Sequence, residues 1–197
     1  TKAVRDGEDW ILNGSKTFIT NGAGADFVLV AARTSPERGA KGISLFAVEA
    51  GMPGFERGRK LDKVGQPESD ISELFFGDVR VPATNVIGEI DQGFVYMMQR
   101  LVTERIGSAV NNLAHARQIL EETLVYARER KAFGTPIGSF QANKFVLAEL
   151  QTMAEVTQAF VDQCTMAAVE GTLTAVDAAK AKWWSAKVQT DILDACV

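Results

Sequence analysis

One stretch of the sequence, "RLVTERIGSA", places a glutamate and an arginine, Glu104 and Arg105, among mostly apolar residues. If the stretch is helical, Glu104 lies one turn from Arg100, and the two can form a surface ion pair that stabilises the helix by about 0.3–0.5 kcal/mol. The apolar neighbours favour the alternative that the helix is partly buried here. A carboxylate shielded from water is a stronger base, so a buried Glu104 would suit proton abstraction. From this pattern alone, a solvated side chain is the simpler interpretation of Glu104.

An aromatic residue and a hydroxyl stand two positions apart in "TFITNG", where Phe18 and Thr20 flank Ile19. Side chains alternate along a strand, so Phe18 and Thr20 would point to the same face. On that face the ring could pack against a planar cofactor while the hydroxyl bonds to its edge. A strand that simply ends at an Asn-Gly turn is the plainer interpretation of the same residues.

A cationic segment, "YARERKAFGTPIGSFQ", spans residues 126–141. Cations at the C-terminal end of a helix compensate its dipole, and Gly134 is a typical helix stop, so a structural role explains much of the segment. That role does not require Phe133 and Gln141 beside the cations. Arg130 could hold a phosphate through two parallel hydrogen bonds, and Phe133 could cover an adenine or pack into a core.

The composition excludes several classes of function. The 197 residues carry a net charge of −4, whereas general nucleic-acid binders have a strong basic excess. A single histidine, His115, cannot supply a histidine-based triad or a histidine-rich metal site, and Cys164 and Cys196 are too few for a disulfide framework or a zinc cluster. We therefore predict no metal site. No apolar run reaches membrane-spanning length, and the N-terminus lacks a secretory signal pattern.

The chain up to about residue 90 has the pattern of strands. Apolar runs such as "DFVLVAAR", "GISLFAVEA" and "SELFFGDVRVP" are separated by loops rich in Gly, Pro and charge. No helical run interrupts them, which favours an antiparallel barrel or sandwich over a parallel sheet. Asn13-Gly14 within "WILNGSKTFI" is a strong hairpin signal, so we expect a turn between two strands there.

From about residue 91 the apolar period becomes helical. We expect a first helix from near Gly93 to Lys131, because cations, Gly134 and Pro136 follow as stop signals. Ser139 is the expected N-cap of a second helix. The class is therefore α+β, with a β domain over residues 1–90 followed by helices over residues 91–197.

These helices have the pattern of a bundle. Thr174 and Asp177 form a capping-box-like start for a third helix. The second helix carries a seam with alternating spacings of four and three, at Val146, Leu150, Met153, Thr157, Phe160, Cys164 and Ala167. Three such helices leave an apolar face that a fourth helix or another chain has to cover, which predicts a partial four-helix bundle with up-down helices. The abrupt ends of the sequence indicate a piece of a longer polypeptide.

Taken together, three stretches resemble the acyl-CoA dehydrogenase family. "WILNGSKTFITNGAGADFVLVAART" is similar to its flavin-side β domain, "KLDKVGQPESDISELFFGDVRVPATNVIGE" to the last strands and the exit to the helices, and "ERKAFGTPIGSFQ" to the FAD-contacting signature between the first two bundle helices. The wider likeness is to the long-chain and isovaleryl-type members. The resemblance implies a fragment that lacks the N-terminal helical domain and the C-terminal end.

The resemblance also implies an activity and a cofactor site. The activity is FAD-dependent oxidation of fatty acyl-CoA thioesters to trans-2-enoyl-CoA, as in fatty acid β-oxidation. The implied flavin-ring contacts are Phe18, Ile19 and Thr20; the family commonly has Trp at the position of Phe18. The implied contacts to the FAD of a neighbouring subunit are Arg130, Phe133 and Gln141. The cofactor site thus implies a homo-oligomer, a dimer or tetramer.

Members of this family place the catalytic base in one of two locations. Many use a glutamate near the C-terminus, in a region outside this sequence, whereas long-chain and isovaleryl-type members use a glutamate immediately before an arginine in the first bundle helix. "TERIG" is similar to the second pattern, which implies Glu104 as the base and Arg105 beside the acyl-CoA; the C-terminal glutamate stays the alternative.

The implied redox partner is an electron-transfer flavoprotein. The alternatives are an oxidase that passes electrons to oxygen and a non-catalytic assembly module. Bacterial cytoplasm and mitochondrial matrix both fit the family.

Overall fold

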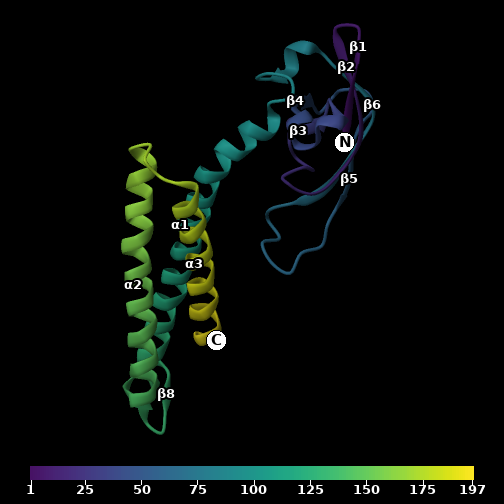
Figure 1. The fold of residues 1–197 in the computed structure, drawn as a ribbon. Helices are drawn as coiled ribbons and strands as arrows, with labels where there is room; N and C mark the ends of the chain where they lie inside the picture. Colours follow the sequence, from purple (N-terminus) through teal and green to yellow (C-terminus); the bar gives the residue numbers. More distant parts are fainter. The chain divides into compact units, whose positions relative to one another are not determined.

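The computed structural model describes residues 1–197, which divide into two units, Thr1–Met98 and Gln99–Val197. Figure 1 traces the strands of the first unit and the helices of the second. None of the helices is long and apolar enough to cross a membrane.

Seven strands of the first unit form one mixed sheet in the order β5-β6-β2-β1-β3-β4-β7. The strands are β1 (Lys2–Asp6), β2 (Asp9–Thr20), β3 (Phe27–Arg33), β4 (Ile43–Glu49), β5 (Phe55–Lys60), β6 (Ile71–Val81) and β7 (Val86–Ile87). All neighbours pair antiparallel except β1 and β3, which are parallel at Lys2 and Arg33. The α+β class is confirmed, but closure into a barrel was wrong, because β5 and β7 lie at opposite edges and do not pair with each other.

The sheet curls around its own apolar core. Trp10 on β2 and Phe46 on β4 are separated by two strands in the sheet order, yet their rings meet edge to face with centroids 5.6 Å apart. Phe46 is fully buried, as are Leu12 and Val79. The inward residues come from alternating positions of β2, β3, β4 and β6, so the period-two pattern of the sequence becomes one buried face.

The expected turn at Asn13-Gly14 was wrong, because both residues lie inside β2. Asn13 faces a bulge of β6 there: Leu12 pairs with Val79 and Gly14 with Phe76, so two residues of β6 oppose Asn13 alone. The amide group of Asn13 donates to Oδ1 of Asp78 and its carbonyl oxygen accepts from the Asp78 backbone N–H, at 2.9 and 3.0 Å. The hairpin of this region instead turns through Gly7 and Glu8, between β1 and β2.

A largely shielded carboxylate, that of Asp91, precedes the first helix, α1 (Gly93–Glu129). It accepts hydrogen bonds from the hydroxyls of Thr34 at 2.6 Å and Ser35 at 2.9 Å, and it forms an ion pair with Arg38 at 2.6 Å. Its own N–H donates to Ser44 Oγ at 2.8 Å. Since only 11% of the Asp91 side chain is exposed, these contacts fasten the chain to the β sheet just before α1 begins.

These contacts predict a pH-dependent stability. Chiefly the hydrogen bond from Thr34, with those from Ser35 and Arg38, holds the pKa of Asp91 below its ordinary value of 3.8, while burial acts in the opposite direction. A lowered folded-state pKa means that the stabilisation is present above about pH 4 and is lost as the pH falls through the folded-state value. We expect Asp91→Asn to lower the free energy of unfolding at neutral pH by about 1.5–3 kcal/mol, the strength of hydrogen bonds to a charged group.

Urea unfolding at neutral pH and near pH 3 checks the Asp91 prediction. The difference between wild type and Asp91→Asn should shrink at the lower pH. Asp26→Asn, an exposed aspartate of the same unit, is the matched control and should change little at either pH. A difference that stays constant with pH would show that the charge of Asp91 contributes nothing.

Three α-helices form the second unit: most of α1, then α2 (Gln141–Val169) and α3 (Ala175–Ala195). Two core clusters run through all three. One joins Ile106 near the start of α1 to Cys164 near the end of α2 and to Ala178 early in α3, and the other joins the opposite ends. The helices therefore run up, down and up, as expected for part of a bundle.

The helix ends match the sequence prediction only in part. The Thr174 hydroxyl accepts from the Asp177 N–H at 3.1 Å, which confirms the predicted cap of α3. Ser139 was the wrong N-cap for α2: the cap is Phe140, which forms no side-chain bond, while the Ser139 hydroxyl donates to the Pro136 carbonyl. The predicted seam of α2 is buried at Leu150, Thr157 and Cys164 but exposed at Val146. The buried stripe of the helix also passes through Ala154 and Val161.

A polar layer crosses the bundle core. The Trp184 indole N–H donates to the fully buried Thr157 Oγ1 at 3.0 Å, which links α3 to α2. The Asn112 side chain donates to the buried Ser185 Oγ at 3.3 Å, which links α1 to α3. Because buried polar groups need partners, each pair fixes the register of two helices.

We expect Thr157→Val to lower the free energy of unfolding by about 1–3 kcal/mol, because it leaves the Trp184 indole N–H without its acceptor. Thr152→Val on the same helix is the matched control, since its exposed hydroxyl bonds only to Ala148 of its own helix, and its effect should stay within about 0.5 kcal/mol. Urea unfolding curves compare the two. Equal losses in both variants would mean that the bond to Trp184 is not the cause.

Candidate functional site

The end of β2 holds a strained and exposed aromatic residue. Lys16 pairs with Leu74 and Ile19 with Ser72, so two residues of β2, Thr17 and Phe18, face one residue of β6 in a bulge. Phe18 has φ +61°, a conformation that bulky residues rarely adopt, and 75% of its surface is exposed. Strain of this kind persists at functional sites, so this bulge is a candidate ligand contact.

The neighbours of Phe18 divide between core and solvent. Ile19 packs against the β core, whereas Thr20 is exposed. Phe18 and Thr20 thus present a ring and a hydroxyl outside the core. This arrangement can stack on a planar group and hydrogen-bond to its edge.

Glu104 and Arg105 lie on α1 at the start of the second unit. Glu104 is exposed and Arg105 is half-buried, while Ile106 and Ala109 face the bundle core. Within the second unit, the bundle core therefore does not shield Glu104, because Ile106 and Ala109 take the inward positions of this turn. The exposed carboxylate of Glu104 can take up a proton from a ligand. The backbone carbonyl of Glu104 accepts a hydrogen bond from the Ser108 hydroxyl at 3.0 Å.

A short hairpin carries the predicted aromatic contact between α1 and α2. Strands β8 (Lys131–Ala132) and β9 (Thr135–Pro136) are joined by Phe133 and Gly134, with φ of +53° and +78°. Two successive positive φ values define a turn that Asn-Gly normally occupies. A phenylalanine in this turn is strained, and 99% of its surface is exposed. The nearest ring, that of Phe140, has its centroid 6.5 Å away.

Arg130 and Gln141 flank the Phe133 hairpin. The Arg130 carbonyl accepts from the Ile137 N–H at 2.8 Å, which closes the segment, and both side chains are exposed. A guanidinium next to an exposed ring can hold a phosphate while the ring covers an attached base. The chemistry of this set fits the phosphate and base of a dinucleotide such as FAD. Separately, a ring and a hydroxyl like those of Phe18 and Thr20 fit the ring system of a flavin.

The structure does not bring Glu104 and Arg130 together. Both belong to the second unit, and α1 rises continuously between them. At 1.5 Å per residue the helix separates them by about 39 Å. One chain therefore cannot place both residues at the same reacting centre.

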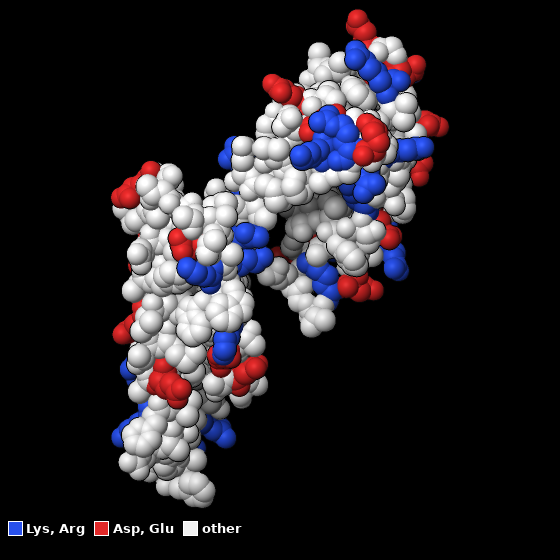
Figure 2. Space-filling view, viewed as in Figure 1, with Lys and Arg blue, Asp and Glu red and all other residues white.

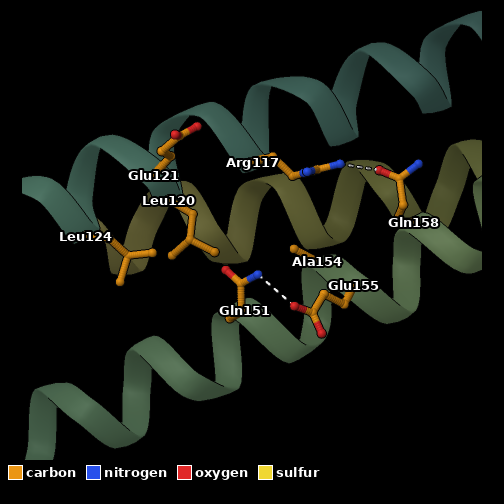
Figure 3. A pocket seen from close by; sticks show the side chains of 8 residues that line it. All are labelled: Arg117, Leu120, Glu121, Leu124, Gln151, Ala154, Glu155 and Gln158. Carbon is orange, nitrogen blue, oxygen red and sulfur yellow. Dashed lines mark hydrogen bonds between the residues drawn. The ribbon is translucent and has the colours of Figure 1, made fainter.

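A groove lies between α1 and α2; the sequence predicted an open face on the bundle but not which helices border it. One part has a volume of about 440 Å³ and an adjoining part about 460 Å³. In Figure 3 the Arg117 guanidinium points toward Gln158, to which it donates at 2.8 Å, and Gln151 donates to Glu155 at 2.8 Å. Leu120, Leu124 and Ala154 contribute apolar surface. In the sequence, the polar residues that line this groove alternate with the buried residues of α1 and α2.

Other reactive groups are poorly placed for chemistry. Cys164 is buried, and burial is the main cause that raises the pKa of its thiol, so it stays protonated and packs as a core residue, as predicted. His115 lies on the surface of α1 beside Gln189, at 3.2 Å. On the face shown in Figure 2, cationic and anionic side chains are interspersed within each unit.

Comparison with known proteins decides the family. The sequence matches the description "Acyl-CoA dehydrogenase, middle domain" over residues 1–79 and "Acyl-CoA dehydrogenase, C-terminal domain" over residues 91–197. The chain belongs to the acyl-CoA dehydrogenase family. The family predicted from the sequence motifs is confirmed.

Two curated acyl-CoA dehydrogenases illustrate the likeness. The chain is 46% identical to the long-chain specific, mitochondrial enzyme of Sus scrofa, over all of this chain and 46% of that protein. It is 38% identical to the mitochondrial isovaleryl-CoA dehydrogenase of Pongo abelii, over 97% of this chain and 46% of that protein. The chain thus spans about half the length of the curated relatives it matches.

Solved structures of acyl-CoA dehydrogenases share the fold. An acyl-CoA dehydrogenase from Geobacillus kaustophilus superposes with a TM-score of 0.97 at 40% identity, covering 99% of this chain and 52% of that one. A glutaryl-CoA dehydrogenase from Mycobacterium smegmatis in complex with FADH2 superposes with a TM-score of 0.91 at 29% identity, covering 100% and 49%.

Proposed function

We propose that the complete protein is an FAD-dependent acyl-CoA dehydrogenase that converts a fatty acyl-CoA thioester to its trans-2-enoyl-CoA. The observation that carries this proposal is membership of the acyl-CoA dehydrogenase family over both units of the chain. The strained, exposed Phe18 beside Thr20 supports it, because a ring and a hydroxyl on one surface suit a flavin. Residues 1–90 would form the flavin-side β domain and residues 91–197 part of the helical bundle.

In this proposal the protein supplies placement and a base. Glu104 removes the α-proton of the thioester through a carboxylate oxygen, and Arg105 contacts the acyl-CoA beside it. Phe18 and Thr20 orient the cofactor, whose ring packs on one and bonds to the other. When bound, FAD supplies the hydride-accepting chemistry. The exposure of Glu104 in the bundle means that bound substrate has to exclude water from it before the carboxylate becomes a strong base.

The length of α1 supports a site shared between subunits. Because about 39 Å separates Glu104 from Arg130, the Arg130, Phe133 and Gln141 set would serve the FAD of a neighbouring copy. A homo-oligomer, a dimer or tetramer, would then be required for cofactor binding. The groove between α1 and α2 is where we expect a fourth helix of the complete protein or another chain to pack.

The substrate and the electron acceptor are the finer parts of the proposal. The similarity to a long-chain specific relative favours long or branched acyl-CoA thioesters, and the proposed acceptor is an electron-transfer flavoprotein. The mitochondrial matrix or the bacterial cytoplasm would then be the working compartment.

Anaerobic titration of the complete protein with acyl-CoA thioesters of increasing chain length tests the function. We expect yellow protein whose flavin absorbance bleaches, fastest with a preferred chain length, and is restored by an electron-transfer flavoprotein. In a parallel assay with oxygen present, hydrogen peroxide released in stoichiometric amount with the acyl-CoA would indicate an oxidase instead. Protein that purifies colourless and ignores added FAD would indicate a non-catalytic assembly module.

A further inference from the structure

The turn that follows Thr20 is held by an aspartate from another part of the sheet. The Asn21 N–H donates to the backbone carbonyl of Asp70 at 3.0 Å, and the Ala23 N–H donates to Oδ1 of its carboxylate, also at 3.0 Å. Asp70 immediately precedes β6, the neighbour of β2 in the sheet. One residue therefore secures the turn through both its main chain and its side chain.

Besides Asp70, the end of β2 is held by the packing of Ile19 on the core, by an Arg57 side-chain bond to the Ala25 carbonyl and by a short ladder with β6. Beyond the bulge at Phe18, only two pairs remain in the ladder with β6, Ile19 with Ser72 and Thr20 with Ile71. A strand end with so little pairing frays unless the following turn is anchored. The bonds to Asp70 supply that anchor.

The turn has three backbone hydrogen bonds of its own, from the Gly22 N–H to the Ile19 carbonyl and from the Gly24 and Ala25 N–H groups to the Asn21 carbonyl, and the bonds to Asp70 fix it against β6. Asn21 has φ +59°, and a Cβ on Gly22 would lie 2.5 Å from Ser72 Oγ, so the chain passes close over β6. Phe18, three residues earlier, is also in the left-handed region. Conformations of this kind each cost of order 1–3 kcal/mol and persist only where surrounding contacts enforce them.

We propose that Asp70 is the positioning residue for the flavin contact: its bonds to the Asn21–Ala23 turn keep Phe18 and Thr20 in the conformation that receives the ring. Asp70 does not touch the cofactor in this scheme; it acts through the turn. This inference rests on the proposed function, because it assigns a role to Asp70 only if Phe18 and Thr20 contact a flavin.

Three variants of the complete protein separate the acceptor from its charge. Asp70→Ala removes the acceptor for Ala23, whereas Asp70→Asn keeps an oxygen at that place and removes the charge. Asp62→Ala, an exposed aspartate in the loop before β6 that forms no bond, is the matched control. We expect Asp70→Ala to raise the Kd for FAD about three- to tenfold, the effect of losing one hydrogen bond that favours the competent shape.

Two readouts distinguish positioning from general stability. The visible circular dichroism of the bound flavin should change in Asp70→Ala, and hydrogen exchange of the residue 19–25 peptide should quicken in the FAD-free protein. Asp70→Asn should restore both to within about twofold of wild type, as expected when the neutral oxygen suffices. If Asp70→Ala does not fold, Asp70→Ser, whose hydroxyl is too short to reach the Ala23 N–H, replaces it in the same comparison.

The outcomes are separable. Wild-type protein that does not bind FAD overturns the proposed function and this inference with it. Wild-type protein that binds FAD, with an Asp70→Ala variant that matches it in Kd and in flavin dichroism, overturns the inference alone. Asp70→Asn behaving like Asp70→Ala would also overturn it, since the acceptor would then not be the cause.

Discussion

Glu104→Gln in the complete protein is expected to slow flavin reduction by acyl-CoA about 10²- to 10⁴-fold, the usual contribution of a positioned general base. Glutamine has nearly the size of glutamate but cannot take up the α-proton. Stopped-flow reduction under anaerobic conditions at saturating substrate measures the change. FAD content should match wild type, because Glu104 acts on the acyl-CoA in this proposal and is not one of the proposed cofactor contacts.

A matched control lies on the same helix. Glu122 is exposed and accepts a hydrogen bond only from Gln118, so Glu122→Gln should leave the reduction rate within about twofold of wild type. A Glu104→Gln rate close to wild type would place the base elsewhere. A glutamate near the C-terminus of the complete protein would then be the next residue to change.

Phe46→Ala is expected to lower the free energy of unfolding of the β unit by about 3–5 kcal/mol, the typical cost of deleting a buried aromatic ring. The ring is fully buried and contacts Trp10 at the point where the sheet curls over itself. Removing the ring would leave a cavity between β4 and β2. These strands do not pair with each other, so they are not held at a fixed backbone hydrogen-bond spacing across the cavity. Urea unfolding followed by near-ultraviolet dichroism, measured in a Trp183→Phe, Trp184→Phe background so that Trp10 is the tryptophan that remains, measures the loss.

Phe27→Ala is the control for Phe46→Ala. Phe27 begins β3 and 64% of its surface is exposed, so its loss should cost less than about 1 kcal/mol, the range of strand propensities. Similar costs for the two variants would mean that the ring of Phe46 contributes no more than an exposed one.

Local patterns predicted the elements but not all of their ends. The capping residues Thr174 and Asp177 are three positions apart and act within one helical turn, so their role could be predicted directly from the sequence. Asn13-Gly14 gave a wrong turn prediction because the same dipeptide can also lie within a strand. Here Asn13 bonds to Asp78 in the bulge of the neighbouring strand, far along the chain. Closure into a barrel likewise depended on whether the first and last strands of the sheet meet, which no local pattern encodes.

Residue types in the candidate site could be predicted, but their conformations could not. The sequence showed an aromatic residue beside a hydroxyl at Phe18 and beside a cation at Phe133. It did not show that both phenylalanines have positive φ. It suggested that the helix around Glu104 is partly buried, and the structure buries Ile106 and Ala109 while leaving Glu104 exposed. Whether one helix position faces in or out depends on which neighbouring helices pack on it. Asp70 gave no sequence signal, because its role depends on a turn nearly 50 positions away.

The continuity of α1 has a consequence for insertions and deletions. Between Glu104 and Arg130 the helix has no break, so it sets both the distance and the angular phase between the proposed base and the proposed cofactor contact. Removing a single residue there would shift one end by about 1.5 Å and rotate it by about 100° relative to the other. A change of seven residues would nearly restore the phase while altering the length by about 10 Å. If both proposed roles hold, the number of residues between these two sites is a functional quantity in itself, one that substitutions along α1 would never reveal.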